Sequence, residues 1–246
     1  MMNQVTNAEP VDSNWQSLYK IGGMAALVAV LVGLIEIAIT FLPGGDVSPE
    51  TVIDWFRLFE NNWFLGLRNL GLLNIFLVSL GVLIFFALYG AHRQVNKMYA
   101  ALALIIYILG AAVFYATNRA FAMLDLSNQY AAATTDSQRI VLAAAGQAML
   151  SVGKSHTPGT FIAFFLSEIS SIGMSLVMLR SKIFSKASAY VGVLGFGLLL
   201  IFEICSSFMP AVKDVAMIIV MLGGLSSMVW YILIARRLFR LGRGVS

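Results

Sequence analysis

The chain has 246 residues, of which 59% are hydrophobic and 11% are charged, with a formal net charge of +4 and a mean hydropathy of +0.86. A soluble domain has about a quarter of its residues charged, so this composition excludes an ordinary soluble protein and indicates a membrane protein. No nucleic-acid partner is expected, because the basic residues follow the loops in the way that membrane orientation requires.

Six apolar stretches are long enough to cross a bilayer, whose hydrocarbon core of about 30 Å needs about 20 helical residues. They predict an all-α membrane protein, built as a six-transmembrane-helix bundle. The predicted spans are, in chain order, roughly residues 21–42, 63–89, 98–124, 159–179, 187–209 and 215–235. The predicted domains are a disordered tail over residues 1–15, one transmembrane domain over residues 16–240 and a second tail over residues 241–246.

Most of the basic residues lie on one side of these spans, and the rule that positive loops stay inside assigns that side to the cytoplasm. Both termini are therefore predicted to be cytoplasmic, and the loops over residues 43–62 and 125–158 are predicted to face outward. The residues that decide this orientation are Lys20, Arg93, Lys97, Arg180, Lys182, Lys186, Arg236, Arg237, Arg240 and Arg243.

The first outward loop is predicted to form an amphipathic helix. Ser48 is a good N-cap, and Pro49 is a good first helical residue. One apolar face follows at the spacing i, i+3, i+4, i+7, made by Val52, Trp55, Phe56 and Phe59. We interpret this helix as lying on the membrane surface, and a lid over an outward-facing cavity is the alternative.

The second outward loop is predicted to contain another amphipathic helix. Residues 139–153 are apolar enough to suggest a seventh span, yet they are too short for one and include Arg139 and Gln147. A seventh span would also turn the basic residues after it to the outside, against the positive-inside rule. We therefore predict an interfacial helix that begins near Asp136, which is an acceptable N-cap.

Eight charged or amide side chains lie within the predicted spans, where such groups are costly and usually face the interior of a bundle. Most lie about 8–9 Å below the outward surface, and Glu168 and Asn74 lie about 14–17 Å deep. We interpret them as a ligand-binding polar pocket that opens outward, and the alternative is a set of bonds that fixes helix register. The eight are Glu36, Arg68, Asn69, Asn74, Asn118, Arg119, Glu168 and Glu203.

Charge pairing makes this prediction more specific. Arg68 and Arg119 are expected to be satisfied by the three glutamates of the set, because a lone charge at the centre of a span costs about 2.5–3.5 kcal/mol. Three acids and two bases leave one acid without a partner. Asn69 and Asn74 are about 140° apart around one helix, so at least one of them is expected to point elsewhere.

Several chemistries lack the residues that they need. A zinc site needs three or four clustered ligands, whereas His92 and His156 are predicted to lie on opposite faces of the membrane. Cys205 is the only cysteine, which excludes an internal disulfide. The sequence therefore predicts no metal, no cofactor and no catalytic residue.

Small residues recur every four positions along the fourth predicted span. This spacing lets another helix approach closely. It makes this face, which we call the small-residue ladder, the candidate surface for a membrane-protein partner or for a homo-oligomer. The ladder consists of Ala163, Ser167, Ser171 and Ser175.

Three segments resemble a known family. They are residues 62–70 (NWFLGLRNL), 129–139 (QYAAATTDSQR) and 144–148 (AAGQA). Over most of its length, the chain resembles the uncharacterised bacterial family called domain of unknown function 4386. The resemblance implies a multi-pass protein of the bacterial cytoplasmic (inner) membrane with about six spans. It implies no activity and supplies no catalytic residue.

Three classes of function remain open. The first is a protein that binds or moves a small polar solute or a lipid headgroup in the outward pocket. The second is a structural or assembly subunit of a membrane complex, which would use the small-residue ladder. The third is a membrane-embedded enzyme with glutamates as acid and base, which needs two carboxylates facing each other across a space of substrate size.

Overall fold

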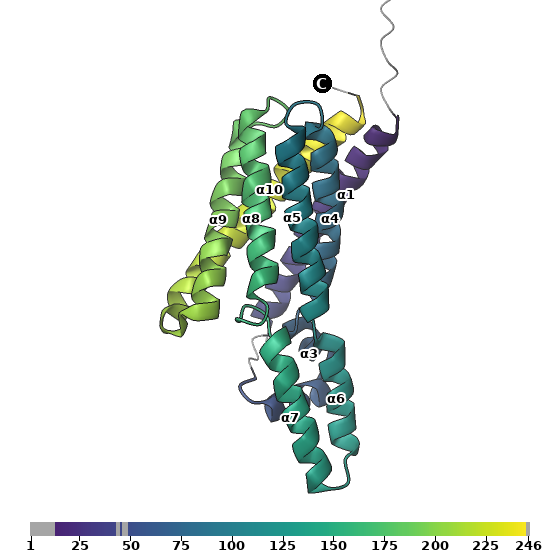
Figure 1. Cartoon of the computed structure of the whole chain (residues 1–246), viewed down its shortest axis with the longest axis vertical. Helices are drawn as coiled ribbons and strands as arrows, with labels where there is room; N and C mark the ends of the chain where they lie inside the picture. Colours follow the sequence, from purple (N-terminus) through teal and green to yellow (C-terminus); the bar gives the residue numbers. More distant parts are fainter. Residues whose placement is uncertain (1–12, 43–44, 46–48, 245–246) are drawn as a thin grey trace, which may run out of the picture.

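The computed structural model describes residues 13–42, 45 and 49–244, and these residues form helices and connecting turns without a strand. Six long helices stand side by side as a bundle, and four shorter helices gather at one end of it (Figure 1). The bundle helices are α1 (Ser13–Phe41), α4 (Leu72–His92), α5 (Lys97–Thr117), α8 (Phe161–Arg180), α9 (Lys186–Phe208) and α10 (Lys213–Gly242). The shorter helices, which we call the cap, are α2 (Val52–Asn61), α3 (Trp63–Asn69), α6 (Ala120–Ala132) and α7 (Asp136–Gly153).

The six bundle helices form a closed ring. Each packs against the next one in the chain, and α10 returns to pack against α1. Six segments are long and apolar enough to cross a membrane, which confirms the number of predicted spans. Aromatic side chains fill the interior of the ring, where Phe85 stacks on Tyr107 with 4.2 Å between ring centroids and Trp230 is fully buried.

The second predicted span begins later than the sequence suggested. The segment from Trp63 is not one helix, because α3 ends at Asn69 and Gly71 then adopts a left-handed conformation with φ of 90°. Glycine adopts this conformation at no steric cost, and it redirects the chain before α4 begins. Arg68 and Asn69 therefore belong to the cap.

The third predicted span is interrupted too. Helix α5 ends at Thr117, and Asn118 is in an extended conformation before α6 starts at Ala120. The Asn118 side chain stabilises both breaks, because its Nδ2 donates to Leu70 O at 3.0 Å and its Oδ1 accepts from Ala120 N at 3.2 Å. Asn118 and Arg119 thus lie at a junction between bundle and cap.

The cap has a hydrophobic core of its own, separate from that of the bundle. The predicted apolar face of α2 is correct, but its partner is not the membrane surface. Trp55, Phe56 and Phe59 are buried against α3, α6 and α7, and Ser127 Oγ donates to Phe56 O at 3.0 Å. The apolar face turns inward because α6 and α7 form a hairpin that offers it a matching surface.

Helices α2 and α7 both begin with a capping box. Thr51 caps α2 together with Asp54, and Thr135 caps α7 together with Gln138. The predicted start of α7 near Asp136 is confirmed, although its N-cap is the preceding residue. Pro49 precedes α2 instead of opening it, and the predicted cap at Ser48 lies outside the described residues.

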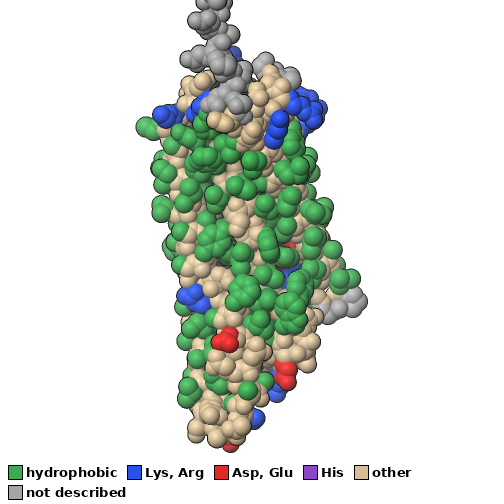
Figure 2. All heavy atoms as spheres, turned by 90° about the vertical axis from the view of Figure 1, so that its right-hand side faces the viewer, with side chains coloured by type: hydrophobic (Ala, Val, Ile, Leu, Met, Phe, Trp, Pro, Cys, Tyr) green, Lys and Arg blue, Asp and Glu red, His purple; other side chains and the backbone are tan. Residues whose placement is uncertain are grey.

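The two ends of the described chain lie at the same end of the bundle, opposite the cap (Figure 1). Lysine and arginine side chains gather at that end, above a broad apolar band (Figure 2). Helix α1 already begins at Ser13, so the last residues of the predicted disordered tail are helical. The Arg93 guanidinium lies over the Trp15 ring, 4.1 Å from its centroid. Residues 1–12 and 245–246 of the predicted tails lie outside the described residues.

Candidate functional site

A cavity of about 530 Å³ lies where the bundle meets the cap. Its wall combines segments that are far apart in the sequence: α1, α2, α3, α4, the loop before α8, α9 and α10. Polar and charged groups line part of the wall, and apolar side chains from α9 and α10 line the rest. The lining residues include Glu36, Pro49, Trp55, Arg68, Asn69, Asn74, Lys154, Ser155, His156, Thr157, Phe202, Ser206, Met209, Ala216 and Met217.

Arg68 is the centre of one polar network on this wall. Its Nη2 pairs with Glu36 Oε1 at 2.7 Å and also donates to Glu36 O and Thr40 Oγ1. Its Nη1 donates to Asn69 Oδ1 at 2.9 Å and to Gly45 O at 3.3 Å. The network ties α3 to the end of α1, and it meets the prediction that a glutamate satisfies Arg68. The buried Nε has no hydrogen-bond partner among the described residues.

A second ion pair joins His156 to Glu203. His156 Nδ1 lies 2.6 Å from Glu203 Oε2, and Ser207 Oγ donates to the other carboxylate oxygen at 3.2 Å. The Glu203 side chain is buried, whereas the imidazole lies partly exposed at the cavity between the rings of Phe164 and Phe202. His156 has a positive φ of 56°, which a residue with a side chain rarely adopts unless its surroundings hold it.

Sequence reasoning missed His156 as a site residue. No local pattern connects it to Glu203, because His156 lies in a loop and Glu203 lies in the last third of a later helix. One hint was present in the sequence, because the predicted set contains three acids and only two bases. His156 is the additional base.

Asn69 and Asn74 both line the cavity, which corrects the prediction that at least one of them points elsewhere. The prediction assumed one continuous helix through both residues. Because the chain changes direction at Gly71, the two amides belong to different helices and approach the same space.

Arg119 pairs with none of the three glutamates Glu36, Glu168 and Glu203, so this part of the charge prediction is wrong. Its Nη1 donates to two backbone carbonyls, Ala116 O at 2.7 Å and Asn118 O at 3.1 Å. These carbonyls are free to accept because α5 ends at this point. Arg119 and Asn118 thus stabilise the junction of α5 with α6, and neither lines the cavity.

Glu168 lies deeper in the bundle than the cavity and is not part of its lining. Its Oε2 is buried without a hydrogen-bond partner among the described residues. It lies within electrostatic range of Glu203, and it also interacts with Tyr107 and Tyr231. Among the described residues, Glu168 is thus the acid of the predicted set that has no basic partner.

The small-residue ladder of α8 packs against the chain's own helices. A side chain at Gly110 of α5 would contact Ala163 O and Ser167 Oγ, and a side chain at Gly192 of α9 would meet Ser175 Oγ. Ala163, Ser171 and Ser175 are buried. This face is occupied within the protein, and a partner helix would need a different surface.

Two of the three predicted glutamates have a basic partner. Glu36 is paired with Arg68, and Glu203 is paired with His156. Among the described residues, no three His, Cys, Asp or Glu side chains are grouped so that they could hold a metal ion. The pairs Arg68–Glu36 and His156–Glu203 thus meet at one polar cavity.

Comparisons with known proteins give one match. The model of a protein family described as a domain of unknown function, DUF4386, matches residues 21–235. No curated protein and no solved structure matches the chain. The match reaches all six spans and includes the cap and every lining residue of the cavity, and the chain therefore belongs to the DUF4386 family of domains of unknown function.

Proposed function

We propose that this integral membrane protein binds a small polar solute or a lipid headgroup in the cavity between bundle and cap, and that the cavity faces outward. The observation that supports it most is the meeting of two ion pairs, Arg68–Glu36 and His156–Glu203, at one cavity of about 530 Å³. A space of this size accommodates a small molecule.

The position of the ion pairs supports a binding role. Glu36 lies five residues before the end of α1, which places it about 8 Å inside that helix end. Charged groups at such depth are costly, and ion pairs of this kind often stabilise a protein less than apolar side chains of similar volume would. Polar groups kept at a cavity despite this cost favour a ligand over a purely structural purpose.

The packing below the cavity favours binding over free passage. Phe85 and Tyr107 stack in the interior of the ring, and Trp230 packs edge-on against Phe196 with 5.0 Å between ring centroids. These rings close the bundle toward the end at which the termini lie. Movement of a solute across the membrane would require these aromatic contacts to rearrange.

Cysteine accessibility tests the proposed outward cavity. In a Cys205→Ser background, Asn74→Cys should react with a small, membrane-impermeant methanethiosulfonate reagent added outside intact cells, because Asn74 lines the cavity. Ala87→Cys is the matched control on the same helix, since Ala87 is fully buried and should not react. Reaction of Asn74→Cys only after the membrane is opened would contradict the proposal.

Ligand binding is tested by thermal unfolding of the purified protein with inorganic phosphate, glycerol phosphate, glycine, choline and detergent-solubilised lipids. A ligand present at 100 times its Kd stabilises the folded state by about 2.7 kcal/mol, which raises the unfolding temperature measurably. His156→Gln should remove the shift produced by the active compound. Absence of any shift, together with an inaccessible Asn74→Cys, would overturn the proposed function.

A further inference from the structure

We infer that the ligand of this cavity is an amphiphile with a phosphate-bearing head, and that it enters sideways from the membrane between the cap ends of α1 and α10. The inference rests on the proposed function and specifies its ligand. It follows from three features: the divergence of the two helices, the roof of the cavity, and the charge that remains once the ion pairs are formed.

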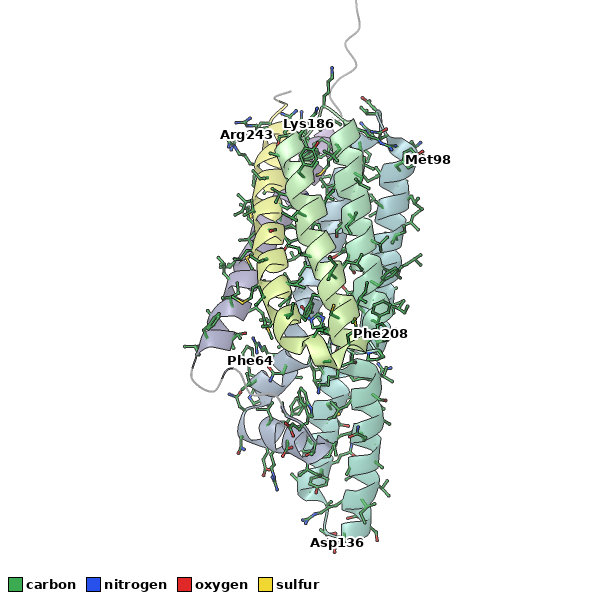
Figure 3. All side chains as sticks on the ribbon, turned by 90° about the vertical axis from the view of Figure 1, so that its left-hand side faces the viewer. Phe64, Met98, Asp136, Lys186, Phe208 and Arg243 are labelled. Carbon is green, nitrogen blue, oxygen red and sulfur yellow. The ribbon has the colours of Figure 1, made fainter. Side chains whose placement is uncertain are left out.

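Helices α1 and α10 are in contact at the level of Gly33 and are farther apart near the cap. A side chain at Gly33 of α1 would meet the Met228 methyl of α10, so the two helices touch there. Nearer to the cap the cavity lies between them, with Glu36 on one side and Met217 on the other. Figure 3 shows the two ribbons separating toward the cap. Both side chains are accessible at this level, since Glu36 is 40% exposed and Met217 is 53% exposed.

The cavity is covered on the side that faces away from the bundle. Pro49 and Trp55 are both buried, and both line it from the segment that leads into α2 and from α2 itself. The side toward α10 has instead Met217 and Met209, which are flexible apolar side chains. A molecule with an apolar chain can place that chain among these methionines while its polar head lies in the cavity.

The charges of the cavity favour an anionic head. Both carboxylates already have partners: Glu36 is paired with Arg68, and Glu203 is held by His156 Nδ1 and Ser207 Oγ. Lys154 also lines the cavity, and it has no carboxylate within ion-pair distance among the described residues. The ammonium of Lys154 is thus the uncompensated charge, and a phosphate group accepts hydrogen bonds from it and from neighbouring amides and hydroxyls.

A phosphate group could belong to a membrane lipid or to a soluble phosphate ester, and an experiment separates the two sources. Delipidated full-length protein is mixed with phosphatidylglycerol, phosphatidylcholine or glycerol phosphate, and bound molecules are counted by native mass spectrometry. We expect one tightly bound phosphatidylglycerol and weaker phosphatidylcholine. Lys154→Gln should reduce phosphatidylglycerol affinity about tenfold, the factor that corresponds to about 1.4 kcal/mol.

The sideways path is tested with two substitutions on the same helix. Met217→Trp places a bulky ring at the opening and should reduce phosphatidylglycerol binding at least as strongly as Lys154→Gln. Met221→Trp is the matched control, because Met221 is also 53% exposed, lies one turn deeper and does not line the cavity. Equal effects of the two tryptophans would overturn the path.

The outcomes also separate this inference from the proposed function. Glycerol phosphate that binds equally to the original chain and to Met217→Trp, without bound phosphatidylglycerol, would overturn the amphiphile and leave a cavity for a soluble solute. Phosphatidylglycerol binding unchanged by Lys154→Gln would overturn the assigned head site. Loss of binding for all three compounds, with Asn74→Cys unreactive from outside, would overturn both proposals.

Discussion

Helix α2 of the cap turns its large apolar side chains inward, whereas every helix of the bundle also exposes large apolar side chains along its outer face. Trp55, Phe56 and Phe59 of α2 are buried in the cap, and its polar residues Asp54 and Arg57 form an exposed ion pair at 3.8 Å. In the bundle, helix contacts are made by small residues and by aromatic rings in the interior. Helix α2 is therefore built like an amphipathic helix of a water-soluble domain, and the bundle is built for contact with lipid.

The difference explains why the cavity lies at their boundary. Polar groups at the junction can reach water through the cap and can be anchored by the rigid helices of the bundle. The apolar groups of α9 and α10 border the same space. A site of this composition could not form inside either region alone.

The largest effect is expected in the core of the cap. Phe56→Ala should cost about 3–5 kcal/mol, since it removes a buried ring where apolar burial is the main stabilising force. Hydrogen exchange should then rise in α2, α6 and α7 while α8 and α9 stay protected. A loss of protection spread evenly over both regions would show that cap and bundle unfold as one unit.

Removal of the ion pair that links the regions should have a smaller effect. Arg68→Leu should cost about 1.5–3 kcal/mol, the range for hydrogen bonds to charged groups, measured by thermal unfolding in detergent. Because Arg68 pairs with Glu36, its cost should shrink when Glu36→Gln is already present. Arg119→Leu is the control, and its effect should simply add to that of Glu36→Gln. Additive costs for Arg68→Leu as well would contradict a coupled pair.

Close packing in the bundle can be tested on α9 alone. A side chain at Gly192 would lie 2.5 Å from Trp230 Nε1 and would meet Ser175 Oγ, whereas one at Gly197 finds nothing within 4 Å. Gly192→Ala should destabilise the protein by about 1–3 kcal/mol through overpacking. Gly197→Ala should be neutral or stabilising, because alanine favours the helix. Equal effects of the two alanines would refute close contact at Gly192.

The smallest effect concerns the exposed capping box of α2. Hydrogen bonds from Thr51 to the Asp54 carboxylate are the main reason why the pKa of that group is lowered. Because the pKa is lower in the folded state, the Asp54 carboxylate stabilises the folded protein above about pH 4. This stabilisation is lost as the pH falls through the folded-state pKa. Hydrogen exchange in the first turn of α2 should rise on acidification, and Asp54→Asn should largely remove this pH dependence. A pH response unchanged in Asp54→Asn would assign it to another group.

The number of spans could be predicted from the sequence because bilayer thickness sets the length of each apolar stretch. The break at Gly71 could not, since a glycine within an apolar run is equally compatible with a continuous helix. Its left-handed conformation is fixed by tertiary contacts, including the bond from Asn118 to Leu70 O. Predictions of depth for Arg68 and Arg119 failed for the same reason, because each depended on an unbroken span.

The candidate site residues likewise divide into those that the sequence could predict and those that it could not. Four of the predicted eight line the cavity, and these are Glu36, Arg68, Asn69 and Asn74. Glu203 reaches it through His156. Polar residues in apolar segments are visible to sequence reasoning, whereas Lys154 and His156 lie in a loop where polar residues are ordinary. Only the folded arrangement brings that loop over the bundle.

The closed ring of helices has a consequence for how the protein is made. Five of its contacts join spans that follow each other in the chain, so each can form as the next span enters the membrane. The contact between α1 and α10 joins the first span to the last and must wait until synthesis is complete. This last contact closes the ring, and residues of both α1 and α10 line the cavity. The cavity is thus completed last during biogenesis, after the other helix contacts of the ring have formed.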